Sequence, residues 1–445
     1  MATARIKQTT VLVGLLSILL AGPTIYNADL PGTLKVMGVF KKPASTVVAE
    51  SSDFIVIPDT PHCEDLHYHA SSNLLFTACE ANDQDRFSWF PPLVNMDDPS
   101  VTLKSRGAIH VLDPKTMKST RLDHPSFHGP FVTHGIDVIS DPEKPDGEAV
   151  YIFAVNHVPN FEYYNEAGSP FTARNDIPKT RSRIEIFHHE IGTQTARHVR
   201  SVWDPLIRTP NDILALSPTS FLVTNDHFYR EGLMRTVEDM HRGAEWTETV
   251  HVTLDTLGST LNDSEGVKAS VALDKMHNNN GLGHGKEAND VLVAECTSGI
   301  LDIGHVSWNE TRAVITIKDT VQFDTIIDNP SYFADPFADT DYDGSSYLAP
   351  GLTRAFELHN AIRDASGTVL VPVTVWSARP HSFADGQSHK WETRLLFEDD
   401  GMRLRSVSSA VQVAIDPATE GGHRRAWLFM TGFISSNMVA VKVDV

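Results

Sequence analysis

The hydrophobic pattern of the chain is a series of short β-prone runs, each followed by a cluster of Asn, Asp, Gly or Ser. Runs of this kind occupy 54–57, 74–78 and 108–112, and the last of them is 438–443. Many short strands bounded by turn residues are typical of β-sandwiches, barrels and propellers. Amphipathic helical periodicity is rare, and its best example is 228–242. The pattern therefore predicts an all-β protein.

A strand–turn–strand theme returns along the chain after roughly 40 to 50 residues, which is the spacing of propeller blades. A propeller is also the all-β architecture that most easily accommodates about 400 residues in one domain. The sequence has no WD or kelch signature and no linker that would divide it. We therefore predict a single domain over 45–445, with long loops at 335–346 and 378–390.

The N-terminal end has a pattern of its own. Residues 1–25 contain two basic side chains followed by an apolar run over 11–22. The run is too short to span a bilayer comfortably, so it fits a secretory signal peptide or a signal-anchor, and a buried N-terminal helix is the alternative. We expect entry into the secretory pathway, with the protein secreted or associated with the membrane through this segment. Asn262 and Asn309 begin sequons and are candidate glycosylation sites in that compartment.

Composition and charge narrow the choice of partners. The chain has 445 residues, of which 41% are apolar and 21% charged, as in a globular protein with a sizeable core. Its 37 Lys and Arg against 57 Asp and Glu give a formal charge of −20. Such a field repels phosphate backbones, so we expect no nucleic-acid partner, and a cation is more natural. The three Cys are too few for a disulfide scaffold and lack the spacing of a zinc site.

Four short strings place carboxylate or amide oxygens at expected strand starts. They are Glu64-Asp65, Asn211-Asp212, Asn280-Gly281 and Asp328-Asn329. Calcium prefers six to eight oxygen ligands, and the tunnel of a propeller receives one strand start from every blade. Adjacent residues of a strand point to opposite sides, so one pair could serve two ions. On residue type alone, turn formation is the favoured explanation of these strings, because Asn and Asp are common turn formers.

Taken in order, these and other strings resemble the paraoxonase/arylesterase family of calcium-dependent lactonases. The matching strings are Cys-Glu-Asp-Leu (63–66), Thr-His-Gly-Ile (133–136), Val-Asn-His (155–157), Ser-Arg-Ile-Glu-Ile-Phe (182–187), Pro-Asn-Asp-Ile (210–213) and Thr-Asn-Asp-His-Phe (224–228). The resemblance runs from about residue 50 to the C-terminus and is that of a divergent member of fungal or microbial type. It implies a six-bladed β-propeller with a central calcium-binding tunnel, preceded by an N-terminal hydrophobic segment.

The resemblance also implies two calcium ions, each with its own oxygen ligands. Those of the catalytic ion would be Glu64, Asn211, Asn280, Asp328 and Asn329. Those of a deeper, structural ion would be Asp65, Asp212 and the carbonyl oxygen of Ile136. Asn278 and Asn279 offer alternative registers for Asn280. The catalytic set has two negative charges, which leaves the ion electrophilic and open to a substrate oxygen.

The same resemblance makes His134 and His157 a dyad above the catalytic calcium. His134 would deprotonate a water and His157 would orient it, while calcium polarises the carbonyl of a small-molecule ester or lactone. We therefore expect calcium-dependent hydrolysis of carboxylic esters and lactones, with organophosphates as a promiscuous substrate class. The alternatives are a non-catalytic, calcium-stabilised propeller that acts as a binding module, and a sugar-lactonase with one metal. Asp226 and His227 would lie near the site or line its pocket.

The chain departs from the family pattern in three places. The family commonly joins its N-terminal strand to its last strand by a disulfide, and here no Cys lies near the C-terminus. Cys63 and Cys79 instead flank an expected hairpin, where they form a disulfide or remain two buried thiols; Cys296 is expected to be buried in a strand. An insertion around 331–390 and an aromatic loop at 87–92 are expected to reshape the pocket or form a membrane-facing rim.

Overall fold

The computed structural model describes residues 29–45, 53–164, 177–258, 260–381 and 390–445. The apolar run at 11–22, expected to be a signal peptide or anchor, lies outside the described residues. Within the described ranges, the structure contains no helix that is both long and apolar enough to cross a membrane.

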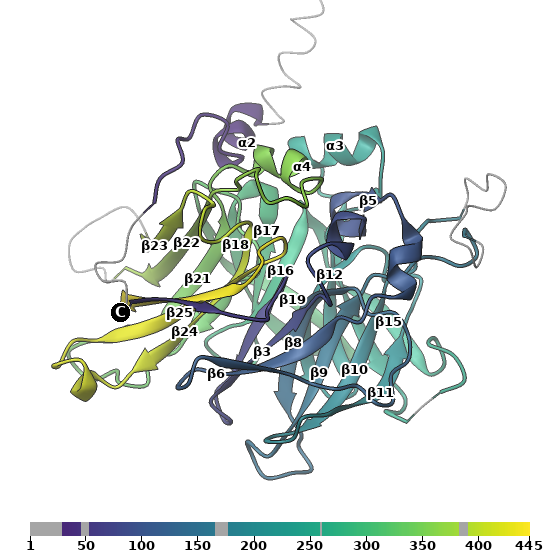
Figure 1. Cartoon of the computed structure of the whole chain (residues 1–445), viewed down its shortest axis with the longest axis horizontal. Helices are drawn as coiled ribbons and strands as arrows, with labels where there is room; N and C mark the ends of the chain where they lie inside the picture. Colours follow the sequence, from purple (N-terminus) through teal and green to yellow (C-terminus); the bar gives the residue numbers. More distant parts are fainter. Residues whose placement is uncertain (1–28, 46–52, 165–176, 259, 382–389) are drawn as a thin grey trace, which may run out of the picture.

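The described residues form six four-stranded antiparallel sheets arranged as the blades of a propeller (Figure 1). Blade one consists of β2 (Leu66–His69), β3 (Leu74–Cys79), β6 (Ala108–Asp113) and β7 (Lys118–Arg121). Blade two consists of β8 (Thr133–Ser140), β9 (Ala149–Asn156), β10 (Arg183–Glu190) and β11 (Ala196–Val202). Blade three consists of β12 (Pro210–Ser217), β13 (Ser220–Asn225), β14 (Thr247–Leu254) and β15 (Val267–Met276).

The second half of the ring follows the same order along the chain. Blade four consists of β16 (Asn279–His284), β17 (Asp290–Glu295), β18 (Ile300–Asn309) and β19 (Arg312–Gln322). Blade five consists of β20 (Ser331–Phe333), β21 (Ser346–Leu352), β22 (Val373–Pro380) and β23 (Trp391–Asp399). Blade six consists of β24 (Val407–Ile415), β25 (Arg425–Gly432), β26 (Met438–Asp444) and β1 (Phe54–Ile57). The predicted all-β, six-bladed propeller is thus confirmed.

The smaller elements gather between the blades and at one end of the propeller. A two-stranded ribbon, β4 (Trp89–Phe90) with β5 (Asn95–Met96), lies in the connection inside blade one. The helices α2 (Leu30–Val36), α3 (Leu233–Met240) and α4 (Leu358–Ala361) lie together at one end (Figure 1). The helix expected over 228–242 is therefore shorter than its pattern indicated.

The ring is closed by backbone pairing between the two ends of the described chain. Strand β1 pairs antiparallel with β26, with Phe54 opposite Val441 and Ile57 opposite Met438. The first strand therefore completes the last blade, which replaces the covalent closure that the family pattern led us to look for. The disulfide of this chain lies elsewhere, between Cys63 and Cys79 in blade one, and the Cys296 thiol is buried and free.

The segment 331–390, which we expected to include an insertion, contains strands of the propeller itself. It supplies β20, β21 and β22, which are three of the four strands of blade five. The hairpin was hidden because β20 has only three residues and a long Asp-rich turn separates it from β21. Of this segment, the part that reaches the cavity described below is the connection between β21 and β22, which contains α4.

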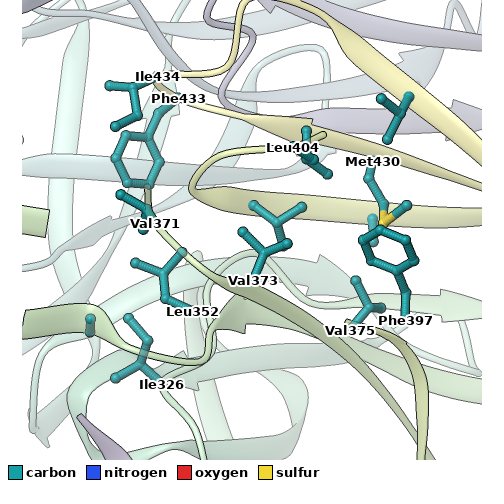
Figure 2. Packing of buried hydrophobic residues seen from close by; sticks show 14 of the residues in the cluster. Ile326, Leu352, Val371, Val373, Val375, Phe397, Leu404, Met430, Phe433 and Ile434 are labelled. Carbon is teal, nitrogen blue, oxygen red and sulfur yellow. The ribbon is translucent and has the colours of Figure 1, made fainter. Parts of the chain in front are cut away.

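Apolar side chains between neighbouring blades form the core. The largest cluster lies between blades five and six, and Figure 2 shows Val373, Val375 and Phe397 of blade five facing Met430 of blade six. At its other end the cluster reaches Ile326 and Leu352, which also line the cavity described below (Figure 2). The same apolar cluster therefore packs two blades together and forms part of the cavity wall.

Removing the disulfide should destabilise the protein without changing its architecture. Cys63 and Cys79 are 16 residues apart, and cross-linking a loop of this length restricts the unfolded chain by about 3 kcal/mol. We expect the double variant Cys63→Ala/Cys79→Ala to lose about 2–4 kcal/mol of unfolding free energy, measured by urea denaturation. Cys296→Ala is the control, because its thiol is unpaired. A reductant that destabilises wild type and double variant equally would contradict the prediction.

Candidate functional site

A cavity of about 450 Å³ opens at the end of the propeller where the helices lie. Its polar lining includes Glu64, His134, Asn211, Asn280 and Asp328. These residues come from five different blades or blade connections, and all were expected at the catalytic site. Strands that begin at the tunnel therefore bring together side chains that are far apart in the sequence.

Breaks in strand register explain why these side chains face the tunnel. The innermost strands of three blades lose register with their neighbours at equivalent places, between Thr133 and Ile136, between Pro210 and Ile213, and between Asn279 and Leu282. A β-bulge re-aims the residues within it and interrupts their pairing. His134, the Asn211-Asp212 pair and Asn280 each lie inside one of these breaks.

Two glycines allow the innermost strands to approach closely at this level. A Cβ at Gly135 would lie 2.4 Å from the carbonyl oxygen of Asn211. A Cβ at Gly281 would lie 2.5 Å from the Cα of Asn329. Any larger residue would push the strands apart, so these glycines hold the expected ligands of different blades side by side.

The oxygens expected to bind the catalytic ion fit a cation. Four oxygens of this expected set are buried and accept no hydrogen bond from the described residues: Glu64 Oε2, Asn211 Oδ1, Asn280 Oδ1 and Asn329 Oδ1. Leaving a buried acceptor without a donor costs about 1–3 kcal/mol each. Asn329 Nδ2 donates to Glu64 Oε1 at 2.9 Å, which fixes the orientation of both side chains. A group of unsatisfied oxygens around one cavity is the donor set that calcium prefers.

The buried carboxylates of the tunnel also fit a cation site. Glu64, Asp65, Asp212 and Asp328 are all buried, and burial raises the pKa of each carboxyl group. The charges of neighbouring carboxylates raise the pKa of Glu64, Asp212 and Asp328 further. No three His, Cys, Asp or Glu side chains of the described residues are arranged to hold a metal by themselves. The expected set is different, because three of its five members are Asn.

The residues expected around the structural ion are more fully hydrogen-bonded. Asp65 accepts from the backbone N–H of Leu66 at 2.7 Å and of Ile136 at 3.0 Å. Asp212 accepts from the N–H of Ile213 and of Leu282, both at 2.7 Å. The two carboxylates therefore join inner strands across the tunnel. Since these oxygens already accept hydrogen bonds, the argument that Asp65 and Asp212 could bind a second ion rests on their buried charge alone.

The two expected catalytic histidines form one hydrogen-bonded chain. His157 Nε2 lies 3.0 Å from His134 Nδ1, and His157 Nδ1 lies 2.8 Å from Ser182 Oγ. His134 Nε2 lies 3.8 Å from Glu64 Oε1. Burial lowers the pKa of His157 to about 3 and that of His134 well below its ordinary value. Both imidazoles are therefore neutral at pH 7, as a general base requires.

The aromatic loop at 87–92, expected to reshape the pocket or to form a rim, lines the cavity through Phe90 and Pro92 and packs against the two histidines. Trp89 Nε1 donates to the carbonyl oxygen of His157 at 2.8 Å. The ring of Phe90 meets that of His134 edge-on, with centroids 5.1 Å apart. Both Trp89 and Phe90 are 1% exposed. The density of aromatic residues at 87–90 was the only sequence signal, and it did not reveal which surface they cover.

A buried ion pair behind the dyad was not foreseen. Arg86 Nη2 lies 3.0 Å from Glu80 Oε1, and the Arg86 guanidinium lies 4.1 Å from the centroid of the Phe90 ring. Glu80 Oε1 also accepts from the backbone N–H of Thr133 at 2.9 Å. Since Thr133 precedes His134, the ion pair anchors the strand that presents His134 to the cavity. Nothing in the local sequence distinguishes Glu80 or Arg86 from ordinary surface charges.

His227 lies on the wall of the cavity as a buried cation. Its ring nitrogens lie 3.1 Å from Asp226 Oδ2 and 2.7 Å from Asp239 Oδ1. Burial and Arg235 lower its pKa, but Asp226 and Asp239 outweigh them and raise it to about 9. Asp226 and His227 therefore line the pocket, as the sequence indicated, and add a fixed charge pair to it.

The candidate glycosylation sites lie away from the cavity. Asn262 and Asn309 are both exposed, and neither is among the residues that line the cavity. An exposed position is what an acceptor Asn needs, and glycosylation stays a prediction.

Another buried carboxylate, Glu185 on β10, supports β9, which ends at Asn156, just before His157. It accepts hydrogen bonds from Arg183 Nε at 2.6 Å, His198 Nε2 at 2.9 Å and Asn156 Nδ2 at 2.9 Å. Asn156 is the residue before His157. Burial raises the pKa of Glu185, but the hydrogen bond from His198 and the charge of Arg183 outweigh it and lower the pKa to about 2.

Glu185 should therefore make stability depend on pH on the acid side. Its folded pKa lies below the ordinary value of 4.5, so its stabilising effect is present above pH 4.5 and is lost as the pH falls toward 2. We expect Glu185→Gln to unfold with about 3 kcal/mol less free energy at pH 7 and the difference to shrink in this window. Urea denaturation at several pH values measures it, with the exposed Glu190→Gln as control. A difference independent of pH would contradict the prediction.

Comparison with known proteins gives one family. The family model "Arylesterase" matches residues 107–336, just over half of the chain. Serum paraoxonase/arylesterase 1 of Mus musculus is 25% identical over 203 residues, which are 45% of each protein. The protein of the same name from Rattus norvegicus is 26% identical over 212 residues, or 47% of each. The matches thus span about half the length of these curated relatives.

A solved propeller gives a much weaker likeness. A gluconolactonase from Xanthomonas campestris aligns over 90% of this chain and 95% of that one, with 12% identity and a TM-score of 0.38. A likeness at this level carries no argument about the site.

Proposed function

Because the chain belongs to the arylesterase family, we propose that it is a calcium-dependent hydrolase of carboxylic esters and lactones. One observation carries the proposal. Buried acceptor oxygens without donors lie around the same cavity as a hydrogen-bonded pair of neutral histidines. The relatives are matched over only about half their length, so the activity is argued from the residues of this chain.

In the proposed reaction, His134 is the general base. Its Nδ1 is engaged by His157, so its Nε2 is the nitrogen left to take a proton from water. In this arrangement the N–H at His134 Nδ1 donates a hydrogen bond to His157 Nε2, and the N–H at His157 Nδ1 donates one to Ser182 Oγ. This chain sets the tautomer and orientation of the base, and it shares the positive charge that develops during attack.

Glu64, Asn211, Asn280, Asp328 and Asn329 would hold the catalytic calcium. When bound, the ion would supply a Lewis acid for the carbonyl oxygen of the substrate. Two carboxylates among five ligands balance the charge of a divalent ion, and the three amide oxygens add coordination without adding charge. We propose Asp65, Asp212 and the Ile136 carbonyl oxygen for a second, structural ion.

The cavity walls favour substrates with an apolar part. Besides its polar residues, the cavity is lined by the apolar side chains of Phe90, Leu93, Ile326, Leu352 and Phe433. A volume of about 450 Å³ accommodates an ester or lactone of moderate size. Hydrolysis of organophosphates remains a prediction of the resemblance, and nothing in the lining selects for it.

We also propose that the chain enters the secretory pathway through its N-terminal apolar run. The Cys63–Cys79 disulfide supports this route, because disulfides persist in oxidising compartments. Recovery of the native protein from the cytosol with reduced cysteines would contradict it.

Chelation should abolish activity and reduce stability together. The proposed ligands come from distant parts of the chain and bind the folded state only, so each ion stabilises it by about 3 kcal/mol at 100 times its Kd. We expect EGTA to lower the unfolding free energy by this order and added calcium to restore both properties. Glu64→Gln should weaken calcium binding, and Asp290→Asn, outside the cavity, is the control. Unchanged activity in metal-free protein would contradict the proposal.

Replacing the base should separate catalysis from metal binding. Without a general base, turnover should fall by about 10²–10⁴-fold. We expect this loss for His134→Gln and a smaller one for His157→Gln, with calcium content unchanged, on both aryl esters and aliphatic lactones. His305→Gln, far from the dyad in sequence, is the control. Full lactonase activity in the His134 variant would exclude the dyad, and no activity in calcium-loaded wild type on any ester or lactone would favour a binding module.

A further inference from the structure

The disulfide of blade one lies next to the candidate active site along both of the segments that it joins. Cys63 is the residue before Glu64, whose side chain lines the cavity. Cys79 is the residue before Glu80, the carboxylate of the buried ion pair. The two cysteines are 1% and 0% exposed. The bond is therefore an internal link between two segments, each of which continues directly into a buried carboxylate.

The backbone ladder of the hairpin stops before it reaches the disulfide. Strands β2 and β3 pair as far as Leu66 opposite Thr77. The residues before Leu66, which include the expected ligands Glu64 and Asp65, extend beyond this ladder. Hydrogen bonds from the β3 side reach the carbonyl groups of residues 61 and 65, on either side of Glu64. Within blade one, the disulfide is therefore the link that acts directly beside Glu64.

The other end of the disulfide leads to the strand that presents His134. Glu80 Oε1 accepts hydrogen bonds from the N–H of Thr133 at 2.9 Å and from Thr133 Oγ1 at 3.2 Å. Arg86 Nη2 donates to Glu80 Oε1 at 3.0 Å and to the carbonyl oxygen of His62 at 2.9 Å. Glu80 and Arg86 therefore connect both segments of the disulfide to the start of β8, where His134 lies.

These links close into a ring at the site itself. His134 Nε2 lies 3.8 Å from Glu64 Oε1, and this approach is the one step of the ring that is neither a covalent bond nor a hydrogen bond. The members of the ring are all buried, and in order they are Glu64, Cys63, Cys79, Glu80, Thr133 and His134. The other steps therefore determine the separation between the Glu64 carboxylate and the His134 imidazole. In a close-packed interior, opening one step displaces the groups on either side of it.

We propose that the Cys63–Cys79 disulfide positions Glu64 relative to His134, and so acts on calcium affinity and turnover as well as on stability. The inference rests on the proposed function, in which Glu64 holds the catalytic calcium and His134 is the base. Both cysteines are positioning residues, since neither of them lines the cavity. Without the bond, the segment before Glu64 moves relative to Glu80, and the ligand and the base lose their fixed separation.

Comparing two destabilised variants of the full-length chain tests the proposal. Cys63→Ala/Cys79→Ala opens the ring, whereas Ile315→Ala removes buried apolar contacts on β19, the outermost strand of blade four, and leaves the ring intact. Both are studied where urea denaturation shows them to be folded. Titration calorimetry of metal-free protein gives the calcium affinity, and aryl ester hydrolysis at saturating calcium gives kcat and KM. The calcium ion that Glu64→Gln weakens is the one to follow.

We expect the double cysteine variant to bind this ion about 10–100-fold more weakly, the usual cost of losing a group that orients a metal ligand. Its kcat should fall by about 10²-fold, as when a reacting group is displaced by about 1 Å, with little change in KM. Ile315→Ala should match wild type in all three quantities. Wild-type affinity and kcat in the double variant would overturn the proposal and leave the disulfide a purely stabilising bond.

A measurement that needs neither activity nor metal separates this inference from the proposed function. In metal-free protein, proton NMR detects the imidazole N–H shared by His134 and His157, and His134→Gln identifies its signal. We expect this signal to be lost in the double cysteine variant and kept in Ile315→Ala. If wild type neither binds calcium nor hydrolyses esters, the proposed function fails, and this signal still decides whether the disulfide positions His134.

Reduction of folded wild type replaces the double variant if the latter does not fold. A phosphine converts the disulfide to two thiols and is itself oxidised to its oxide, and thiol titration counts the opened bonds. The reduced protein should show the same loss of calcium affinity, of kcat and of the imidazole signal. Reduced, folded protein that keeps all three properties would overturn the proposal.

Discussion

Carboxylates buried at the axis of the propeller repel one another in surroundings from which water is excluded. Burial raises the pKa of Glu64, Asp65, Asp212 and Asp328, and the charges of neighbouring carboxylates raise the pKa of Glu64, Asp212 and Asp328 further. Among the described residues, the cation whose charge lowers the pKa of Glu64 is Arg86, which already pairs with Glu80. Backbone N–H groups satisfy part of this charge, and the unpartnered amide oxygens add more negative potential. The tunnel therefore concentrates negative charge and unpartnered oxygens, which the proposed calcium ions would neutralise.

The backbone is adapted to this concentration of polar groups. Register breaks in β8, β12 and β16 turn adjacent residues toward the axis, and Gly135 and Gly281 let neighbouring inner strands approach. Around this axis the blades pack through continuous apolar clusters (Figure 2). The energy of folding thus comes mainly from the contacts between blades, which hold the polar groups in an arrangement they would not adopt by themselves.

The sequence predicted the parts of the site that are written in adjacent residues. The strings at Glu64-Asp65, at Asn211-Asp212 and around His134 were recognisable because each is short and keeps its order along the chain. Blade five was not recognisable, because β20 is only three residues long and its partner follows an Asp-rich turn. Side-chain pairing across the tunnel was equally hidden, as between Glu64 and Asn329.

The supports of the dyad depend on contacts between distant positions. Trp89 reaches the backbone of a residue 68 positions later in the sequence, and Glu80 reaches one 53 positions later. No local periodicity encodes such contacts, since they depend on how the loop inside blade one folds back over its neighbour. Propensity and patterning therefore predicted the architecture of blades, and only the three-dimensional structure identified the residues that hold His134 and His157 in place.

The pairing of β1 with β26 has a consequence for how the protein is made. Because its first strand belongs to its last blade, the ring stays an open arc until the ribosome has delivered nearly the entire chain. During synthesis, β1 must wait unpaired while five blades form, and its exposed edge is then open to pairing with other chains. The axis is also incomplete in the open arc. The proposed ions, whose ligands come from several blades, would therefore bind only after the ring has closed, in whatever compartment the chain has then reached.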